Sequence, residues 1–159
     1  GDWAQDRLIP DILRAQGEGV LPQIRYPDSV RPWQHVLEPL SGYVELAERL
    51  YQEPSAFAEA WNFGPDMTDE RPVRWIAERM AALAGRDAAR AWQAQPGVHA
   101  HEAAALRLDS SKARQRLGWQ PRWSLEQALN AIVDWDRAWR AGSDMQAICL
   151  QQIQAHSAV

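Results

Sequence analysis

Residues 31–43 read RPWQHVLEPLSGY, and a helical pattern begins within this stretch. It follows a turn at Pro27-Asp28 and leads into a helix, because the apolar residues beyond it recur at helical spacing. These residues are Leu37, Leu40, Val44, Ala47 and Leu50, and Pro54 ends the helix. The stretch therefore predicts a loop that enters an amphipathic helix.

Towards the amino terminus the sequence predicts one helix and one strand. The helix spans residues 6–15, with Pro10 tolerated in its first turn and with Gly17 and Gly19 ending it. The strand spans residues 21–26. A short helix and a strand are therefore expected before residues 31–43.

Beyond that stretch, residues 61–63 predict a short apolar strand that ends in a turn at Gly64-Pro65. This strand requires a sheet partner, which either lies outside the chain or is one of two candidates within it, residues 21–26 or residues 105–108. Residues 73–83 form an amphipathic helix that ends at Gly85, and the Ala-rich residues 86–97 are helical or loop.

The last third of the chain predicts three helices. The first is capped by Asp109 or Ser110 and runs to Leu117. The second begins with a capping-box pattern at residues 124–127 and continues to Gly142, and the third has a similar signature at residues 143–146. The sum is a helix-rich domain with a few short strands, too few to form a good independent sheet.

Composition excludes several classes of function. The net charge is −4, so the overall field does not favour nucleic acid or an anionic membrane. Cys149 is the only cysteine, which excludes an intramolecular disulfide and a Cys-based zinc cluster and favours the cytoplasm. No apolar run approaches the roughly 20 residues of a membrane span. The start lacks both signal-peptide character and methionine, so we expect a fragment or a processed chain.

Several runs together resemble one enzyme family, and the 31–43 run is the most specific of them. The others are Asp2-Trp3-Ala4, residues 6–11, residues 60–65, residues 99–103, residues 108–113 and residues 117–129. In this order they resemble the CDP-glucose 4,6-dehydratases, which belong to the extended short-chain dehydrogenase/reductase superfamily. The resemblance covers nearly the whole chain.

The resemblance implies an α/β enzyme of which residues 1–159 are the carboxy-terminal, sugar-nucleotide-binding domain. An amino-terminal Rossmann domain would hold NAD, and this chain alone is not expected to bind the cofactor. The family converts CDP-glucose to CDP-4-keto-6-deoxyglucose and water, a lyase reaction of deoxysugar and lipopolysaccharide O-antigen biosynthesis. The implied partners are CDP-glucose or a related sugar nucleotide, the Rossmann half and further copies of the full enzyme.

The chain departs from the family where redox chemistry is carried. Lys112 is the only lysine and Leu108 stands four positions before it, so the Tyr-x-x-x-Lys pair is missing. Gly17-Glu18-Gly19 is followed at the third position by Pro22 instead of glycine, so the dinucleotide fingerprint is missing too. We therefore expect no catalytic residue in this chain, and no turnover by the chain alone.

Two arginines are the first candidates for holding a diphosphate, because a guanidinium binds phosphate oxygens bidentately. Arg31 matches a superfamily arginine that contacts phosphate; the alternative is a solvated loop arginine. Arg7 matches a basic position near the nucleotide, and its alternative is a salt bridge to Asp6 or Asp11.

Other candidates form the wall of the implied pocket. Leu8 and Ile9 follow Arg7, and Ile24 and Arg25 lie on the strand that borders the base in relatives. An alternating strand points only one of two successive side chains inward, so Ile24 and Arg25 cannot both face the pocket.

The last candidates lie in a loop that the resemblance places near the nucleotide. His101 and Glu102 are the residues that we select, whereas His99 is equally compatible with a plain surface loop. With His99 they suggest a metal site, which we reject because zinc needs three or four converging ligands with second-shell support. Trp119, Trp123, Trp135 and Trp139 are interpreted as core residues, and for Trp33 packing is favoured over the alternative of base stacking.

Three hypotheses follow. The chain is the substrate-binding part of the dehydratase, or a stand-alone nucleotide-sugar-binding module, or a helical interaction domain; a dehydratase of another nucleotide sugar is a variant of the first. The choice of CDP rests on resemblance. We expect an exposed apolar surface where this chain meets the Rossmann half, and full burial of Trp61 and Phe63 within the chain would count against it.

Overall fold

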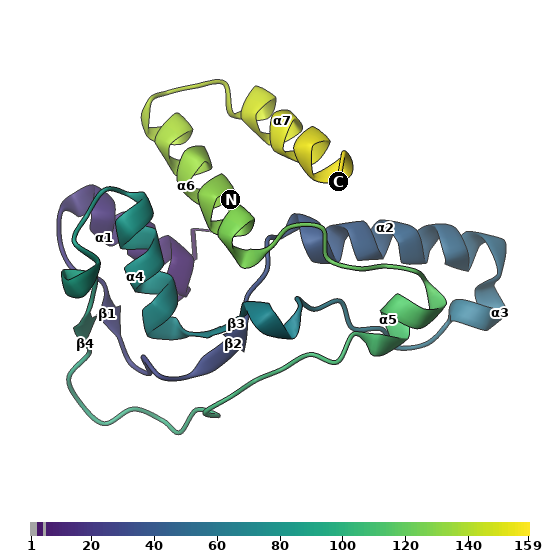
Figure 1. The fold of residues 1–159 in the computed structure, drawn as a ribbon, viewed down its shortest axis with the longest axis horizontal. Helices are drawn as coiled ribbons and strands as arrows, with labels where there is room; N and C mark the ends of the chain where they lie inside the picture. The colour runs from purple at the N-terminus through teal and green to yellow at the C-terminus, as the bar shows by residue number, and fades with distance from the viewer. Residues whose placement is uncertain (1–2, 5) are drawn as a thin grey trace. The chain divides into compact units, whose positions relative to one another are not determined.

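The computed structural model describes residues 3–4 and 6–159 of the chain, which fold into two compact units (Figure 1). Unit 1 comprises residues 1–31 and 71–105, and unit 2 comprises residues 32–70 and 106–159. Asp2, which belongs to the first of the family-like runs, lies outside the described residues. No helix among the described residues has the length and apolar character needed to cross a membrane.

Unit 1 combines two helices with short strands. Helix α1 spans Leu8–Glu18 and helix α4 spans Val73–Leu83. Strand β1 (Gln23–Ile24) pairs in parallel with β4 (Gln93–Ala94), and β2 (Val30–Pro32) pairs with β3 (Glu70–Pro72). The chain passes between the two units within β2 and within β3. A single turn of 3₁₀ helix, η2, spans Ala88–Arg90.

Helix α4 forms over the predicted residues, whereas α1 runs over residues 8–18 instead of 6–15, so that Gly17 lies inside the helix and does not end it. Gly19 ends α1 in the left-handed conformation, with φ 73°, which glycine adopts without a steric penalty. The buried residues of α1 and α4 are Ile12, Leu13, Ala15, Ile76, Ala77, Met80 and Ala81. The middle of the predicted 73–83 stripe is therefore buried, and the amphipathic prediction for α4 is confirmed.

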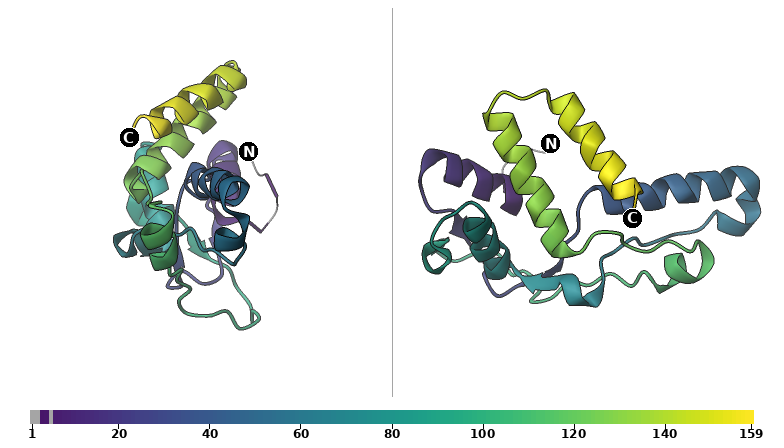
Figure 2. Two further views of the ribbon diagram at one scale, coloured as in Figure 1. Left: turned by 90° about the vertical axis from the view of Figure 1, so that its right-hand side faces the viewer. Right: turned by 45° about the horizontal axis from the view of Figure 1, so that its top comes forward.

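Unit 2 is helical. It contains α2 (Leu37–Gln52), α3 (Pro54–Phe57), α5 (Ser111–Arg116), α6 (Leu125–Arg140) and α7 (Met145–Ser157), with a 3₁₀ turn, η1, at Met67–Asp69. Helices α6 and α7 lie side by side as a hairpin, which Figure 1 and Figure 2 show from three directions. A core cluster of Phe63, Ala113, Leu117 and Trp119 packs with Leu46, Phe57 and Trp61.

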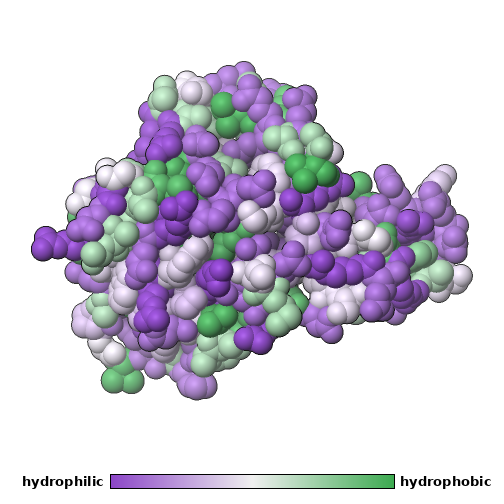
Figure 3. Space-filling view, viewed as in Figure 1, coloured by the Kyte–Doolittle hydropathy of each residue, from purple (hydrophilic) through white to green (hydrophobic). Residues whose placement is uncertain are grey.

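Helix α2 buries a different face from the apolar one. Leu40, Val44 and Ala47 of the predicted stripe are exposed, whereas Glu38 and Gly42 are buried. One reason is the packing of Phe63 on this face: a Cβ atom at Gly42 would lie 2.3 Å from the Phe63 ring, so only glycine lets the ring approach this closely. On the face of the molecule in Figure 3, apolar residues are scattered among polar ones.

The helix caps are partly those predicted. Ser124 and Gln127 form the predicted capping box at the start of α6. At α7 the N-cap is Asp144, whose carboxylate accepts hydrogen bonds from the backbone N–H groups of Gln146 and Ala147. Ser110 precedes α5 without capping it, because its Oγ atom accepts a hydrogen bond from the Gly64 N–H at 2.7 Å instead.

The strand predictions are the least accurate. Only Gln23–Ile24 of the predicted strand 21–26 is a strand. Residues 61–63 are not a strand, because a side chain and not a neighbouring strand supplies a backbone hydrogen bond here. The Gln34 amide donates to the Phe63 carbonyl at 2.9 Å. Of residues 105–108, Ala105 alone makes a bridge, to Val30. The fold class, a helix-rich chain with few short strands, is confirmed.

Candidate functional site

All eight residues that the sequence predicts for ligand binding lie in unit 1. They are Arg7, Leu8, Ile9, Ile24, Arg25, Arg31, His101 and Glu102. They come from the start of α1, from β1 and its end, from β2, and from the segment between β4 and the Ala105 bridge. Residues separated by up to 95 positions in the sequence, from Arg7 to Glu102, thus belong to one unit.

Arg31 and Glu102 are in direct contact. Arg31 lies on β2, and its side chain is only 16% exposed. Its Nη2 atom donates to Glu102 Oε1 in an ion pair, and its Nη1 atom donates to the Val30 carbonyl at 2.7 Å. The Glu102 side chain is 48% exposed, so the pair has one protected member and one that water reaches.

The segment that carries Glu102 is fastened to unit 1 at both ends and in the middle. The Gln95 N–H donates to the Ile24 carbonyl at 3.0 Å, and the Val30 N–H donates to the Ala104 carbonyl at 2.9 Å. Between these two bonds, the Tyr26 hydroxyl donates to the Ala100 carbonyl. We call residues 95–104 the strap, because three hydrogen bonds to its backbone, one of them from the Tyr26 side chain, hold it against residues 24–30.

His99 and His101 differ in their surroundings on the strap. The His99 ring meets Tyr26 edge to face, with ring centroids 5.9 Å apart, and its Nε2 atom lies 3.1 Å from the Gln95 carbonyl oxygen. His101 is exposed. Within the described part of the chain, no group of three or more His, Cys, Asp or Glu residues is placed to hold a metal ion.

Ile24, on β1, and Arg25, directly after it, have opposite environments. Ile24 is buried at 3% exposure, and Arg25 is exposed and pairs with Asp6 at 2.8 Å. Asp11 pairs with Arg14. Each of the two acids that could neutralise Arg7, Asp6 and Asp11, is therefore paired with another arginine. Arg7 is an exposed residue at the N-cap position of α1, and Leu8 and Ile9 are half-buried in the first turn.

Sequence reasoning missed Tyr26, whose hydroxyl and ring both contact the strap. It lies at the end of the predicted strand 21–26, directly before the Pro27-Asp28 turn. A tyrosine at such a position is ordinarily a packing residue, and nothing in the local pattern indicates a partner 74 positions away.

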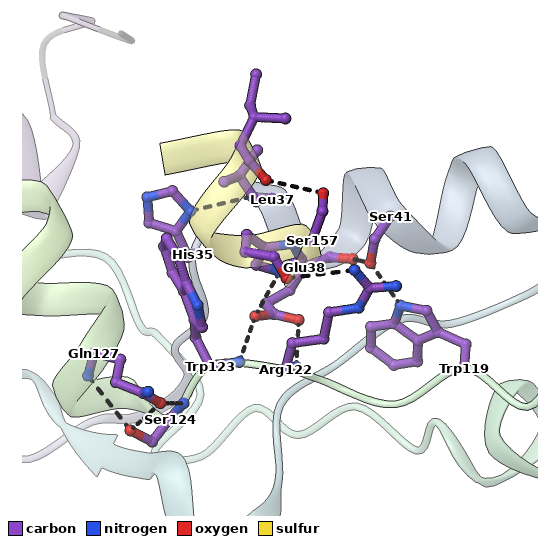
Figure 4. A network of polar contacts seen from close by, with 12 residues as sticks. His35, Leu37, Glu38, Ser41, Trp119, Arg122, Trp123, Ser124, Gln127 and Ser157 are labelled. Carbon is purple, nitrogen blue, oxygen red and sulfur yellow. Dashed lines mark hydrogen bonds and ion pairs between the residues drawn. The ribbon is translucent and has the colours of Figure 1, made fainter. Parts of the chain in front are cut away.

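Unit 2 contains a second polar cluster, centred on the buried Glu38 carboxylate (Figure 4). Glu38 Oε2 accepts from the Arg122 N–H at 2.9 Å, and Oε1 accepts from the Trp123 N–H at 2.9 Å. The His156 Nε2 atom lies 3.0 Å from the same Oε1. Glu38 thereby connects the start of α2, the loop before α6 and the end of α7.

His35 lies at the edge of this cluster. Its ring centroid is 5.0 Å from that of Trp123, and the Trp123 ring is 5.1 Å from that of His156. Burial lowers the pKa of His35 from 6.5 to about 4, helped by the charge of His156 and opposed by that of Glu38. His35 is therefore neutral at pH 7, and its Nδ1 atom accepts a hydrogen bond from the Leu37 N–H.

An open groove of about 610 Å³ lies between α6 and α7. Its lining residues are Trp123, Gln127, Asn130, Ala131, Asp134, Ile148, Gln151, Gln152 and Ala155. Several of its amides are already engaged; the Gln152 amide, for example, donates to the Ala131 carbonyl at 2.8 Å. None of the predicted ligand-binding residues lines this groove.

Comparison with known proteins shows similarity in sequence to a dehydratase. The chain is 53% identical over 145 residues to the CDP-glucose 4,6-dehydratase of Salmonella typhimurium. The match covers 91% of this chain and 40% of the relative, so the chain spans well under half the length of that enzyme. No protein-family model matches the chain.

Solved structures share the fold at low identity. A dTDP-glucose 4,6-dehydratase from Bacillus anthracis, in complex with NAD, matches 87% of this chain and 41% of its own, with 18% identity and a TM-score of 0.68. A UDP-glucuronic acid 4-epimerase from Bacillus cereus matches 84% of this chain and 40% of its own, with 18% identity and a TM-score of 0.71. The chain therefore shares its fold with part of each of these two enzymes.

Proposed function

We propose that this chain is the sugar-nucleotide-binding portion of a CDP-glucose 4,6-dehydratase, and that unit 1 holds the nucleotide. The observation that carries the proposal is the 53% identity over 145 residues to an enzyme of that name. The activity belongs to the whole enzyme, which converts CDP-glucose to CDP-4-keto-6-deoxyglucose and water.

Arg31 is the residue that we assign to the diphosphate. A partly buried guanidinium is a stronger anion ligand than a fully solvated one, because less water competes for its N–H groups. Arg31 has this environment, since β2 and the strap leave its side chain 16% exposed. Arg7 and Arg25 are exposed and would add charge at the edge of the site. Leu8, Ile9 and Ile24 would supply the apolar wall, His101 would supply a polar contact from the strap, and Glu102 would act on the site through its ion pair with Arg31.

The residues of this chain do not fit NAD. Its nearest approach to a glycine-rich fingerprint is Gly17-Glu18-Gly19, at the end of α1. There the Gly19 and Val20 N–H groups donate to the Gln16 and Ala15 carbonyls, so they close the helix instead of facing a pyrophosphate. We assign the cofactor and the proton-transfer groups to an amino-terminal Rossmann half. We expect this chain alone not to convert CDP-glucose.

The exposed side of α2 supports a docking surface for that half. Val36, Leu40, Tyr43, Val44 and Tyr51 are all more than 40% exposed and follow one another at helical spacing. An exposed apolar stripe of this length is typical of an interaction site. The surface is not the one expected from the sequence, because Phe63 is 6% exposed and belongs to the core of unit 2.

Calorimetric titration of the chain with CDP-glucose tests the assignment of binding. We expect binding by the wild-type chain, at least tenfold weaker binding after Arg31→Gln, and little change after Arg90→Gln, an exposed arginine elsewhere in unit 1. Equal affinities for CDP-glucose, UDP-glucose and dTDP-glucose would contradict the assignment of the base. An absence of effect in Arg31→Gln would contradict the assignment of the site.

A stand-alone binding module is the second candidate, and one observation favours it: every assigned binding residue lies in a single unit of this chain. Adding an NAD-loaded amino-terminal half separates the two. Product formation by the mixture supports the dehydratase, and unchanged binding without any product supports the module. A cytoplasmic location and self-association of the whole enzyme are part of the first proposal; the single cysteine agrees with a reducing compartment.

A further inference from the structure

The Arg31–Glu102 ion pair has a consequence for ligand binding, which rests on the proposed role of Arg31. Arg31 has five N–H donors, and in the described structure one of them is directed at the Glu102 carboxylate. A carboxylate and a phosphate present similar pairs of anionic oxygen atoms to a guanidinium. The two groups therefore compete for the same cation.

We propose that Glu102 is a built-in competitor that the diphosphate of the ligand displaces from Arg31. Displacement is feasible without unfolding the strap, because the backbone bonds at Gln95, Ala100 and Ala104 hold it independently of the Glu102 side chain. The carboxylate is 48% exposed, so it moves into water when it leaves the arginine. Only a side-chain rotation is required.

Electrostatics gives the sign of the effect. A diphosphate bound to Arg31 would lie within a few ångströms of the Glu102 carboxylate, and like charges at that separation repel. Glu102→Gln removes both the competing charge and the repulsion while it keeps the length of the side chain. This substitution is therefore expected to strengthen diphosphate binding, by about threefold to fivefold for a pair that is partly exposed.

Inorganic pyrophosphate is the probe that isolates this effect, since it carries the diphosphate without base or sugar. The expected order of affinity is Glu102→Gln above wild type above Arg31→Gln. Glu102→Gln in the Arg31→Gln background is expected to change nothing, because the carboxylate then has no arginine to release. Asp28→Asn is the matched control: it removes the same charge from another ion pair of unit 1, with Arg74, and is expected to leave the affinity unchanged.

Each outcome decides the proposal. Weaker or unchanged pyrophosphate binding in Glu102→Gln overturns it, as does an equal gain in Asp28→Asn, which would mark a general charge effect. An absence of pyrophosphate binding in both wild type and Glu102→Gln overturns it as well. If Glu102→Gln strengthens pyrophosphate binding but CDP-glucose binds no tighter than pyrophosphate, the competitor stands and the proposed function fails. If Arg31→Gln alone weakens CDP-glucose binding, the proposed function stands and the competitor fails.

Discussion

The His156 imidazole and the Glu38 carboxylate are 118 positions apart in the sequence, yet their Nε2 and Oε1 atoms lie 3.0 Å apart. Both side chains are almost completely buried, at 4% and 1% exposure. A buried carboxylate is stable only when hydrogen-bond donors surround it, and here two backbone N–H groups and one imidazole do so. The last turn of α7 is thereby tied to the first turn of α2.

Glu38→Ala is expected to destabilise the protein by about 3 kcal/mol, because the Arg122 and Trp123 N–H groups and the buried His156 imidazole all lose their partner. Urea unfolding measures the change. Glu45→Ala is the matched control, since Glu45 also lies on α2 but pairs with Arg49 at the surface, and it is expected to cost about 0.5 kcal/mol or less. Equal losses of unfolding free energy in the two variants would contradict the stabilising role of the buried Glu38 carboxylate.

His35 is expected to make stability fall in acid. Its pKa is about 4 in the folded chain and 6.5 when exposed, so the unfolded chain binds the proton more tightly. The neutral side chain contributes its full stability above pH 6.5, and about 3 kcal/mol is lost as the pH falls from 6.5 to 4. Urea unfolding at pH 7 and pH 5 measures this. His35→Asn is expected to flatten the dependence, and an unchanged slope would contradict the account.

Gly42→Ala is expected to cost at least 2 kcal/mol, because the new methyl group would overlap the Phe63 ring and overpack the core. Thermal unfolding reports the loss. Phe63→Leu in the same chain makes room for the methyl group, so the double variant is expected to be more stable than the sum of the two single losses predicts. Simple additivity would show that the contact is not the cause.

Asp144→Ala is expected to cost about 1 kcal/mol, since its carboxylate accepts hydrogen bonds from two N–H groups in the first turn of α7. Ser143→Ala, one residue earlier, is expected to be nearly neutral. Chemical denaturation of both variants distinguishes the observed cap, Asp144, from Ser143, which the 143–146 pattern suggests. A larger loss of unfolding free energy in Ser143→Ala than in Asp144→Ala would mean that Ser143 is the cap.

Local patterns predicted the helices well and the strands poorly. The capping box at Ser124, the glycine that ends α1 and the buried residues of α4 are determined by neighbours within a few positions, so sequence reasoning reached them. The strands are two or three residues long, and β1 and β4 pair across about 70 positions. Such short segments carry no detectable alternation of apolar and polar residues. In residues 61–63, the Phe63 carbonyl accepts its hydrogen bond from the Gln34 side chain and not from a neighbouring strand.

The buried face of α2 shows the same limit. Its apolar stripe is exposed, whereas Glu38 and Gly42 are buried, because their partners come from distant segments. The candidate site was chosen by resemblance, and the folding of all eight residues into unit 1 was not predictable from spacing. The Arg31–Glu102 contact joins positions 71 apart, so no local pattern indicates it.

The most direct measurement is product formation from CDP-glucose by this chain mixed with the NAD-loaded amino-terminal half of the Salmonella typhimurium enzyme. We expect no product from either part alone, product from the mixture, and loss of that product when Arg31→Gln replaces the wild-type chain. A mixture that binds CDP-glucose through this chain and yet forms no product, or a chain that turns over alone, would contradict the account.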